Sequence, residues 1–283
     1  MSEAGALDIA HLRGWIGRSE TEADIVTPAL VLKFAATFDL DAASFPPGAV
    51  APLGIHLCLA PVVSPTSALA PDGHSAAGDF LPPVPLPRRM WAGGEQRLER
   101  PLRVGDEVRR TSSITEVKAK TGRTGLLCFV TVEHRFEVEG RQALAERHDI
   151  VYREAAAPTL AARAPAETEV GRWQKRIETT PALLFRYSAV TFNSHRIHYD
   201  HPYTTEAEHY PDLVVHGPLQ TTLLHNMAAE LRGGQPPKRF SFRAAAPAFA
   251  GQPLTLHAKE AGALLKLWTS TKGAKAMEAE AEW

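Results

Sequence analysis

The chain has 283 residues, enough for one large domain or two of ordinary size. Apolar residues make up 44% and charged residues 22%, as in compact globular proteins, so composition excludes the disordered and fibrous classes. The 31 basic and 32 acidic residues give a net charge of -1, so no overall field attracts nucleic acid or an anionic membrane.

Targeting and membrane signals are also missing from the sequence. The N-terminal stretch MSEAGALDIAHLRGW carries acidic residues where a secretory signal has a basic region and an apolar run. No apolar stretch approaches the roughly 20 residues that cross a bilayer. Cys58 and Cys128 are too few for a disulfide framework. We therefore expect a cytoplasmic protein that binds neither membrane nor nucleic acid, with both thiols buried.

The first predicted element is a helix that begins after Thr27. Pro28 suits the first helical position, Thr27 suits the N-cap, and apolar Leu30, Phe34 and Phe38 recur at helical spacing. A Pro/Gly-rich stretch follows at 45–87. Its prolines exclude a central strand or a long helix, so we expect a surface loop there.

Strand signals dominate the rest of the first half. Segments 108–119, 125–140 and 143–154 are rich in β-branched residues and are separated by Gly-containing turns, which predicts long antiparallel hairpins. The small, Pro-containing stretch after them is typical of a linker. The predicted organisation is an N-terminal unit at 1–155, a linker at 156–168 and a C-terminal unit at 169–283.

The second half contains the strongest helix signal, VVHGPLQTTLLHNMAAELRGG at 214–234. Pro218 lies near its start, Gly233 follows its end, and its apolar face comprises Leu219, Leu223, Leu224 and Met227. Strand-like segments at 240–262, 263–273 and 274–283 come next. One apolar helix followed by successive antiparallel strands predicts a sheet wrapped around a central helix.

Two pairs of similar segments within the chain predict a duplicated unit. TPALVLKFAATFD at 27–39 resembles TPALLFRYSAVTFN at 180–193 if one residue is inserted in the second copy. RPLRVGDEV at 100–108 parallels APAFAGQPL at 246–254, with Pro and Gly four positions apart in each. Offsets of 153 to 154 and of 146 positions indicate a unit the size of one small domain.

Histidines gather in and after FNSHRIHYD, residues 192–200: five of the 12 lie between 195 and 216. Metal binding is one interpretation, but HxxHxxH fits neither ligand spacing on a helix nor that on a strand. A second is a capped helix end with solvated histidines. The interpretation we favour is a proton-transfer site, because histidine titrates near neutral pH and Asn193 can orient water.

At these residues the chain resembles the MaoC-like hydratases and dehydratases of the hotdog fold, which carry the motif DxNPxH. The matching stretch is NSHRIH at 193–198. His198 falls on the family histidine and Asn193 on the family aspartate, while His195 and Arg196 replace the usual Asn and Pro. VVHGPLQTTLL and PAFAGQPLTL resemble two further family segments. The resemblance implies an α+β fold of two tandem hotdog units.

Catalytic roles follow from the resemblance. His198 is expected to act as general base toward water, Asn193 to orient that water, and the Gly217 N–H to stabilise the developing enolate. Asp39 aligns with Asn193, but Ser44 stands where His198 stands in the second copy. We therefore expect one active site per chain, with the first half shaping substrate space.

The sequence also supports a more specific expectation about the substrate. GDFLPPVPLPRRMWAGG at 78–94 resembles the fumaryl- and itaconyl-type hydratases and the mitochondrial hydroxyacyl-thioester dehydratases. This subgroup implies 3-methylfumaryl-CoA or itaconyl-CoA as substrate and citramalyl-CoA as product. Arg88, Arg89 and Arg196 are expected to pair with the substrate carboxylate, and His195 is a further expected substrate-binding residue. The alternative is that the three are ordinary surface arginines.

Other functions stay open. A dehydratase acting on neutral 3-hydroxyacyl chains would use the same pair of residues, and a noncatalytic acyl-CoA binding protein or a hotdog thioesterase are further alternatives. The sequence lacks GxxxxGK, GxGxxG and GxSxG, so phosphoryl transfer, hydride transfer and serine hydrolysis have no supporting motif. We expect no cofactor and no metal, an acyl-CoA substrate, and a homodimer.

Overall fold

The computed structural model describes residues 7–76, 78–122, 125–154 and 169–283. Within them lie the helices α1 (Ile9–Arg13), α2 (Pro28–Thr37), α3 (Pro181–Val190) and α4 (Gly217–Glu230). The strands are β1 (Ser19–Ile25), β2 (Arg88–Leu98), β3 (Glu107–Gly122), β4 (Gly125–Val138), β5 (Arg141–Arg153), β6 (Trp173–Ile177), β7 (Arg239–Ala244), β8 (Leu254–Ala261), β9 (Leu264–Thr271) and β10 (Ala274–Glu282). Short helical turns comprise Ala42–Ser44, Ile55–Cys58, Thr66–Ala68, Arg196–His198 and Tyr203–Ala207.

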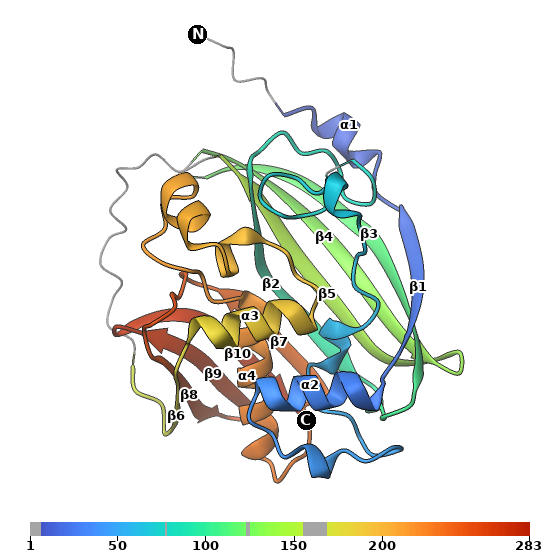
Figure 1. The fold of residues 1–283 in the computed structure, drawn as a ribbon, viewed down its shortest axis with the longest axis vertical. Helices are drawn as coiled ribbons and strands as arrows, with labels where there is room; N and C mark the ends of the chain where they lie inside the picture. Colours follow the sequence, from blue (N-terminus) through green and yellow to red (C-terminus); the bar gives the residue numbers. More distant parts are fainter. Residues whose placement is uncertain (1–6, 77, 123–124, 155–168) are drawn as a thin grey trace.

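All ten of these strands join one antiparallel sheet in the order β1-β3-β4-β5-β2-β7-β10-β9-β8-β6 (Figure 1). The order on one side of the β2–β7 junction is repeated in reverse on the other, as a duplication with two-fold pseudosymmetry requires. Strands from 19–153 form one side and strands from 173–282 the other. The predicted linker, 156–168, lies outside the described residues.

The predicted hairpins are confirmed. β3 pairs with β4 from Val108↔Val138 to Gly122↔Gly125, and β4 pairs with β5 along the length of both strands. At the junction of the two halves, β2 and β7 pair from Gly93↔Arg243 to Arg97↔Arg239, which makes the sheet continuous. The thiols of Cys58 and Cys128 are buried as expected, and burial raises their pKa values to about 12 and about 11.

Helices α2 and α3 are two copies of one element. Each begins with Pro after a threonine N-cap, whose hydroxyl accepts the N–H three residues on at 3.1 Å. Each ends at a left-handed residue, Asp39 with φ 54° or Phe192 with φ 53°. The copies therefore align without the inserted residue that we predicted, and Asp39 corresponds to Phe192 instead of Asn193. The same offset places Phe45, another residue that cannot transfer protons, opposite His198.

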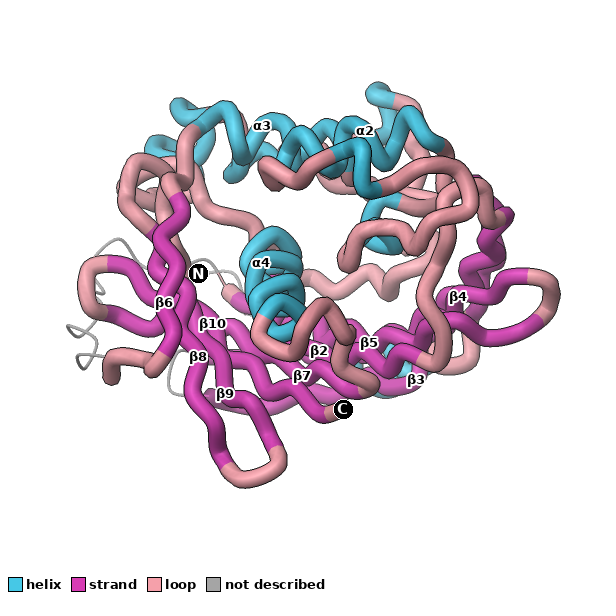
Figure 2. The backbone as a smooth tube through the Cα atoms, turned by 90° about the horizontal axis from the view of Figure 1, so that it is seen from below, coloured by secondary structure: helices cyan, strands magenta, loops and turns pink. Residues whose placement is uncertain are grey.

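The central helix belongs to the second half. α4 lies between the sheet and the layer formed by α2 and α3 (Figure 2), and Leu219, Leu224 and Met227 of its predicted apolar face are buried in the core with Leu184 and Leu256. No helix of comparable length covers the first half of the sheet in the described ranges. No helix there is long and apolar enough to span a membrane.

The Pro/Gly-rich stretch at 45–87 does not run only over the surface, so that prediction was wrong. Ile55, Cys58 and Leu59 of this stretch are 1–4% exposed and pack with Phe34 of α2 and Phe136 of β4. A loop that contributes core residues is fixed in place. Its next segment, residues 71–75, is therefore held close to the second half of the chain.

Candidate active site

His198 lies in the short helical turn Arg196–His198 and is only 7% exposed. Its Nδ1 is 2.7 Å from the carbonyl oxygen of Val214. A carbonyl only accepts hydrogen bonds, so Nδ1 carries the proton and Nε2 keeps its lone pair. Burial lowers the pKa of His198 to about 4, against the opposing hydrogen bond to Val214 and with a further lowering by His74. At neutral pH this imidazole is an uncharged base with a fixed tautomer.

His216 supports this base from one side. Its ring stacks on that of His198 with centroids 3.6 Å apart and an interplanar angle of 20°. Its Nε2 is 2.8 Å from the hydroxyl of Ser188, a residue of α3. Burial, with the charge of His198 as a smaller cause, holds the pKa of His216 well below its usual value. The stacked pair is therefore neutral, and His216 fixes the plane of the His198 ring.

Gly217 follows His216 directly and is the first residue of α4. The N–H groups of a first helical turn have no partners within the helix, and the helix dipole gives this end partial positive charge. A Cβ at position 217 would lie 2.8 Å from Cε3 of Trp91, so only glycine fits beneath that ring. Gly217 therefore lies at the start of α4, directly after His216, with the Trp91 ring packed against it.

Asn193 has a structural use that the sequence did not predict. Its Oδ1 accepts the N–H of His195 at 3.0 Å, and its own N–H bonds to the Ser188 carbonyl at 2.8 Å. The side chain therefore shapes the turn that leads from α3 to His195 and His198. Because it is an amide, residue 193 adds no negative charge to the site.

A loop of the first half completes the cluster. The side chain of Asp72 bonds to His74 at 2.8 Å from Oδ2 to Nδ1, and the rings of His74 and His195 lie 4.0 Å apart. His195 in turn meets His198 edge-on at 5.3 Å. Asp72 and His74 were missed by sequence reasoning. The Asp-Gly-His triplet, polar residues around a turn glycine in a Pro-rich stretch, was the available signal.

Several contacts lock this loop onto the segment 193–196. The N–H of Arg196 bonds to the Asp72 carbonyl at 2.9 Å, and the Ser194 hydroxyl donates to the Gly73 carbonyl at 2.5 Å. Gly73 has φ 89°, and a Cβ there would lie 2.0 Å from the Ser194 carbonyl oxygen. No other residue type fits at 73 without moving one of the two loops.

The three arginines predicted to bind a carboxylate differ in their surroundings. Arg88 pairs with Glu208 at 3.1 Å, and Arg196 pairs with Asp200 at 2.7 Å. Both positive charges are thereby neutralised within the chain, so the structure argues against a carboxylate-binding role for either. Arg89 has no carboxylate partner among the described residues. Its positive charge acts on His74 and on the hydroxyl of Tyr152, which faces it across the strands.

The histidines of HxxHxxH do not converge. His201 is exposed and lies 3.8 Å from Asp212, away from His195 and His198. Donor atoms of Asp72, His74 and His195 do lie within 4.8 Å of one another. The Asp72–His74 hydrogen bond already occupies one donor atom of each, and we interpret the group as a hydrogen-bonded cluster.

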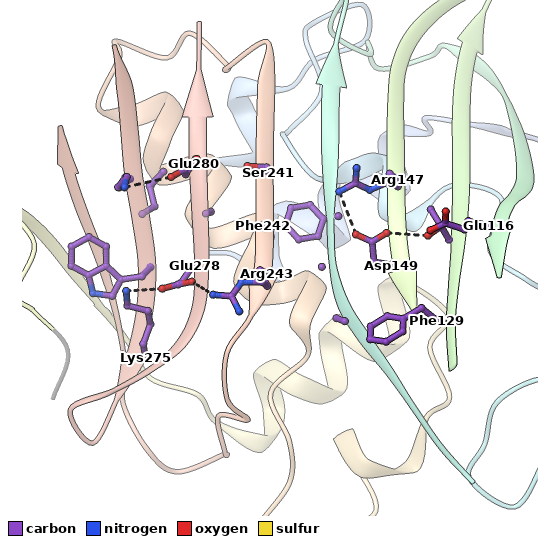
Figure 3. Close-up of a pocket in the computed structure, with 18 of the residues that line it drawn as sticks. Glu116, Phe129, Arg147, Asp149, Ser241, Phe242, Arg243, Lys275, Glu278 and Glu280 are labelled. Atoms are coloured by element: carbon purple, nitrogen blue, oxygen red, sulfur yellow. Dashed lines mark hydrogen bonds and ion pairs between the residues drawn. The ribbon is translucent and has the colours of Figure 1, made fainter. Parts of the chain in front are cut away.

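One surface hollow is separate from the histidine cluster. It measures about 700 Å³ and lies on the outer face of the sheet (Figure 3), because Arg147 and Asp149 in its lining alternate with the inward-facing His148. Its charges largely pair with one another, as Arg147–Asp149 at 3.3 Å and Arg243–Glu278 at 2.6 Å show. It contains none of the histidine cluster.

Comparison with known proteins shows the family to which this chain belongs. A family model described as hydroxyacyl-thioester dehydratase type 2 matches residues 54–250. A relative from Chloroflexus aurantiacus, mesaconyl-C(4)-CoA hydratase, is 42% identical over 96% of this chain and 98% of its own length. This chain belongs to the hydroxyacyl-thioester dehydratase type 2 family. A mitochondrial hydroxyacyl-thioester dehydratase type 2 from Schizosaccharomyces pombe is 32% identical over 75% of this chain and 78% of that protein.

Solved structures confirm the predicted fold. A MaoC-like dehydratase from Phytophthora capsici superposes with a TM-score of 0.74 at 15% identity, covering 98% of this chain and 97% of that one. A Mycobacterium tuberculosis protein described as a double hotdog gives 0.58 at 14% identity, over 94% and 95% of the two chains. The α+β double hotdog, the MaoC-like resemblance and the assignment as a hydratase/dehydratase enzyme are confirmed.

Proposed function

We propose that this hydratase/dehydratase adds water to the double bond of a short enoyl-CoA that carries a second carboxylate, with 3-methylfumaryl-CoA as the best candidate. The hydroxyl of the product, citramalyl-CoA, is on the carbon that bears the carboxylate. Groups that bind this carboxylate must therefore lie next to the base that activates water. His195 contacts His198, His74 contacts His195, and the positive charge of Arg89 acts on His74 and His195; this chain of neighbours next to the base is the observation that supports the proposal.

The chemical step uses groups already placed. Nε2 of His198 removes a proton from water while the water oxygen bonds to the β-carbon. The electron pair of the double bond moves toward the thioester, and the Gly217 N–H with the α4 dipole stabilises the negative oxygen. The proton on His198 then passes to the α-carbon, which restores the neutral base. Asn193 supports the reaction by holding the turn that carries His195 and His198.

The same step discriminates between the two dicarboxylic candidates. In 3-methylfumaryl-CoA, which is the C(4) thioester of mesaconate, the double bond is conjugated with the thioester, so attack at the β-carbon delivers charge to the oxygen near Gly217. In itaconyl-CoA the double bond is not conjugated with the thioester. We therefore place itaconyl-CoA second.

Dehydration of a neutral 3-hydroxyacyl chain, attached to CoA or to acyl carrier protein, is the rival function, and the S. pombe relative bears that name. A buried polar group on the inner face of the first half disfavours a long alkyl chain there. Glu146 is 2% exposed and lies 3.3 Å from His56, 3.1 Å from His148 and 2.8 Å from Gln96. An alkyl chain offers no hydrogen bonds to these polar groups, so a short polar acyl group suits this face better than a long alkyl chain.

A substrate panel tests the proposal. Purified protein is incubated with 3-methylfumaryl-CoA, itaconyl-CoA, crotonyl-CoA and a long-chain enoyl-CoA, and water addition is followed by mass. We expect the highest kcat/KM for 3-methylfumaryl-CoA. Equal turnover of crotonyl-CoA would refute the carboxylate-binding role, and binding of all four thioesters without turnover would support the noncatalytic alternative. Free CoA, detected with a thiol reagent, would indicate a thioesterase.

A further inference from the structure

Among the described residues, the histidine cluster contains one negative charge, and the first half of the chain provides it. Asp72 is the carboxylate whose charge acts on both His74 and His195. Asp200 belongs to the second half but is engaged by Arg196, with 2.8 Å between Oδ2 and Nε. Residue 193 contributes a neutral amide. Whatever electrostatic role a carboxylate has in this site therefore falls to Asp72.

The geometry of Asp72 orients His74. One carboxylate oxygen accepts the backbone N–H of His74 at 3.0 Å, and the other lies 2.8 Å from its Nδ1. Burial raises the pKa of Asp72, but the hydrogen bonds and charge of His74 outweigh burial and hold that pKa well below its usual value. An ionised carboxylate only accepts, so Nδ1 of His74 is the protonated nitrogen and Nε2 is left for a second partner.

Arg89 contributes positive charge to the surroundings of His74 and His195. Its charge lowers the pKa of both His74 and His195, although burial is the larger cause for each. A carboxylate that entered between Arg89 and His74 would cancel this repulsion. It would also place His74 between two negative groups, which favours the imidazolium form.

We propose that Asp72 and His74 form a carboxylate–histidine pair that completes the substrate site from the first half, with His74 donating from Nε2 to the substrate carboxylate. Asp72 is a positioning residue, since it acts through His74. The order of charges is then Asp72 negative, His74 positive, substrate carboxylate negative and Arg89 positive. This inference rests on the proposed function and deepens it.

The same order explains why a neutral residue suits position 193. A carboxylate at 193 would lie in the turn that leads to His195, next to the cluster that is proposed to bind the substrate carboxylate. Like charges held that close repel, so Asn193→Asp is expected to act against an anionic substrate and not against a neutral one. A carboxylate at position 193 therefore cannot replace the carboxylate of Asp72.

The test compares Asp72→Asn, Asn193→Asp and the control Asp79→Asn in the full chain. Asp79 belongs to the same loop but its side chain is exposed. For each variant, kcat/KM is measured for 3-methylfumaryl-CoA and for crotonyl-CoA, and the ratio of the two values is the readout. Loss of structure lowers both values together and leaves the ratio unchanged, whereas loss of the proposed role changes the ratio.

We expect Asp72→Asn to lower the ratio by about 10- to 100-fold, the usual effect of a charge-assisted hydrogen bond, and Asn193→Asp to lower it also. Asp79→Asn should keep the wild-type ratio. An unchanged ratio in Asp72→Asn overturns the inference, even when the variant is less stable. Failure of the proposed function is seen separately, because wild-type protein would then show no preference for 3-methylfumaryl-CoA.

Discussion

The buried, neutral state of His198 makes a specific prediction about acid. At pH 5.5 a histidine with the ordinary pKa of about 6.5 is roughly 10% neutral, whereas one with a pKa of about 4 is roughly 97% neutral. Only the neutral form accepts a proton from water. An ordinary histidine would therefore lose about tenfold in kcat/KM between pH 7.5 and 5.5, and His198 should lose almost nothing.

The assay is initial-rate hydration of crotonyl-CoA from pH 5 to pH 8, because this substrate has no carboxylate for His74 to bind and kcat/KM reports the pKa values of the free enzyme. Low pH also lowers the stability of the fold. Burial lowers the pKa values of His195, His198 and His216 in the folded state, so the unfolded chain binds more protons below about pH 6.5 and stability falls as pH falls. Enzyme held at pH 5.5 and returned to pH 7.5 must therefore regain full activity. With that control satisfied, a midpoint near pH 6.5 in kcat/KM would contradict the account.

Three substitutions and one matched control test the remaining assignments. His198→Ala should lower kcat by about 10²- to 10⁴-fold with an unchanged circular dichroism spectrum, and near-normal turnover would sink the assignment of the base. Arg89→Gln should lower kcat/KM for 3-methylfumaryl-CoA about 10- to 100-fold and leave kcat/KM for crotonyl-CoA nearly unchanged. In the matched variant Arg88→Gln, which removes a charge paired with Glu208, the ratio of the two kcat/KM values should stay as in the wild type. The reverse pattern would assign the carboxylate-binding role to Arg88. Gly217→Ala should lower kcat and the melting temperature together, because its Cβ would be 2.8 Å from the Trp91 ring and would displace the start of α4 with its N–H groups; wild-type values of both would show that this position does not require glycine.

Much of the fold could be predicted from local sequence patterns. Thr27 and Thr180 each precede a proline and cap a helix, and this local chemistry is enough to predict where α2 and α3 begin. The long strands follow from β-branched residues between glycine turns. The alignment of the two copies was wrong by one residue because sequence similarity favoured matching Asp39 with Asn193, whereas the helix ends match Asp39 with Phe192.

Only part of the candidate site could be predicted from the sequence. His195 and His198 belong to one short motif and Gly217 begins a helix with clear sequence signals, so local patterns were enough to propose them. Asp72 and His74 are more than 100 positions away and reach the site through contacts between two loops, such as the hydrogen bond from Ser194 to Gly73. The pairing of arginines with acids is equally long-range in the case of Arg88, which reaches Glu208, and no local pattern indicates which arginine is left for a ligand.

The central claim is that water is added at a carbon bearing a carboxylate, with His198 as base and a positive cluster beside it. The most direct measurement is the ratio of kcat/KM for 3-methylfumaryl-CoA to that for crotonyl-CoA in the wild-type protein, with citramalyl-CoA identified by mass. We predict a ratio of at least about 10, since one charge-assisted contact is usually worth that much. A ratio near one, or no citramalyl-CoA, would contradict the account.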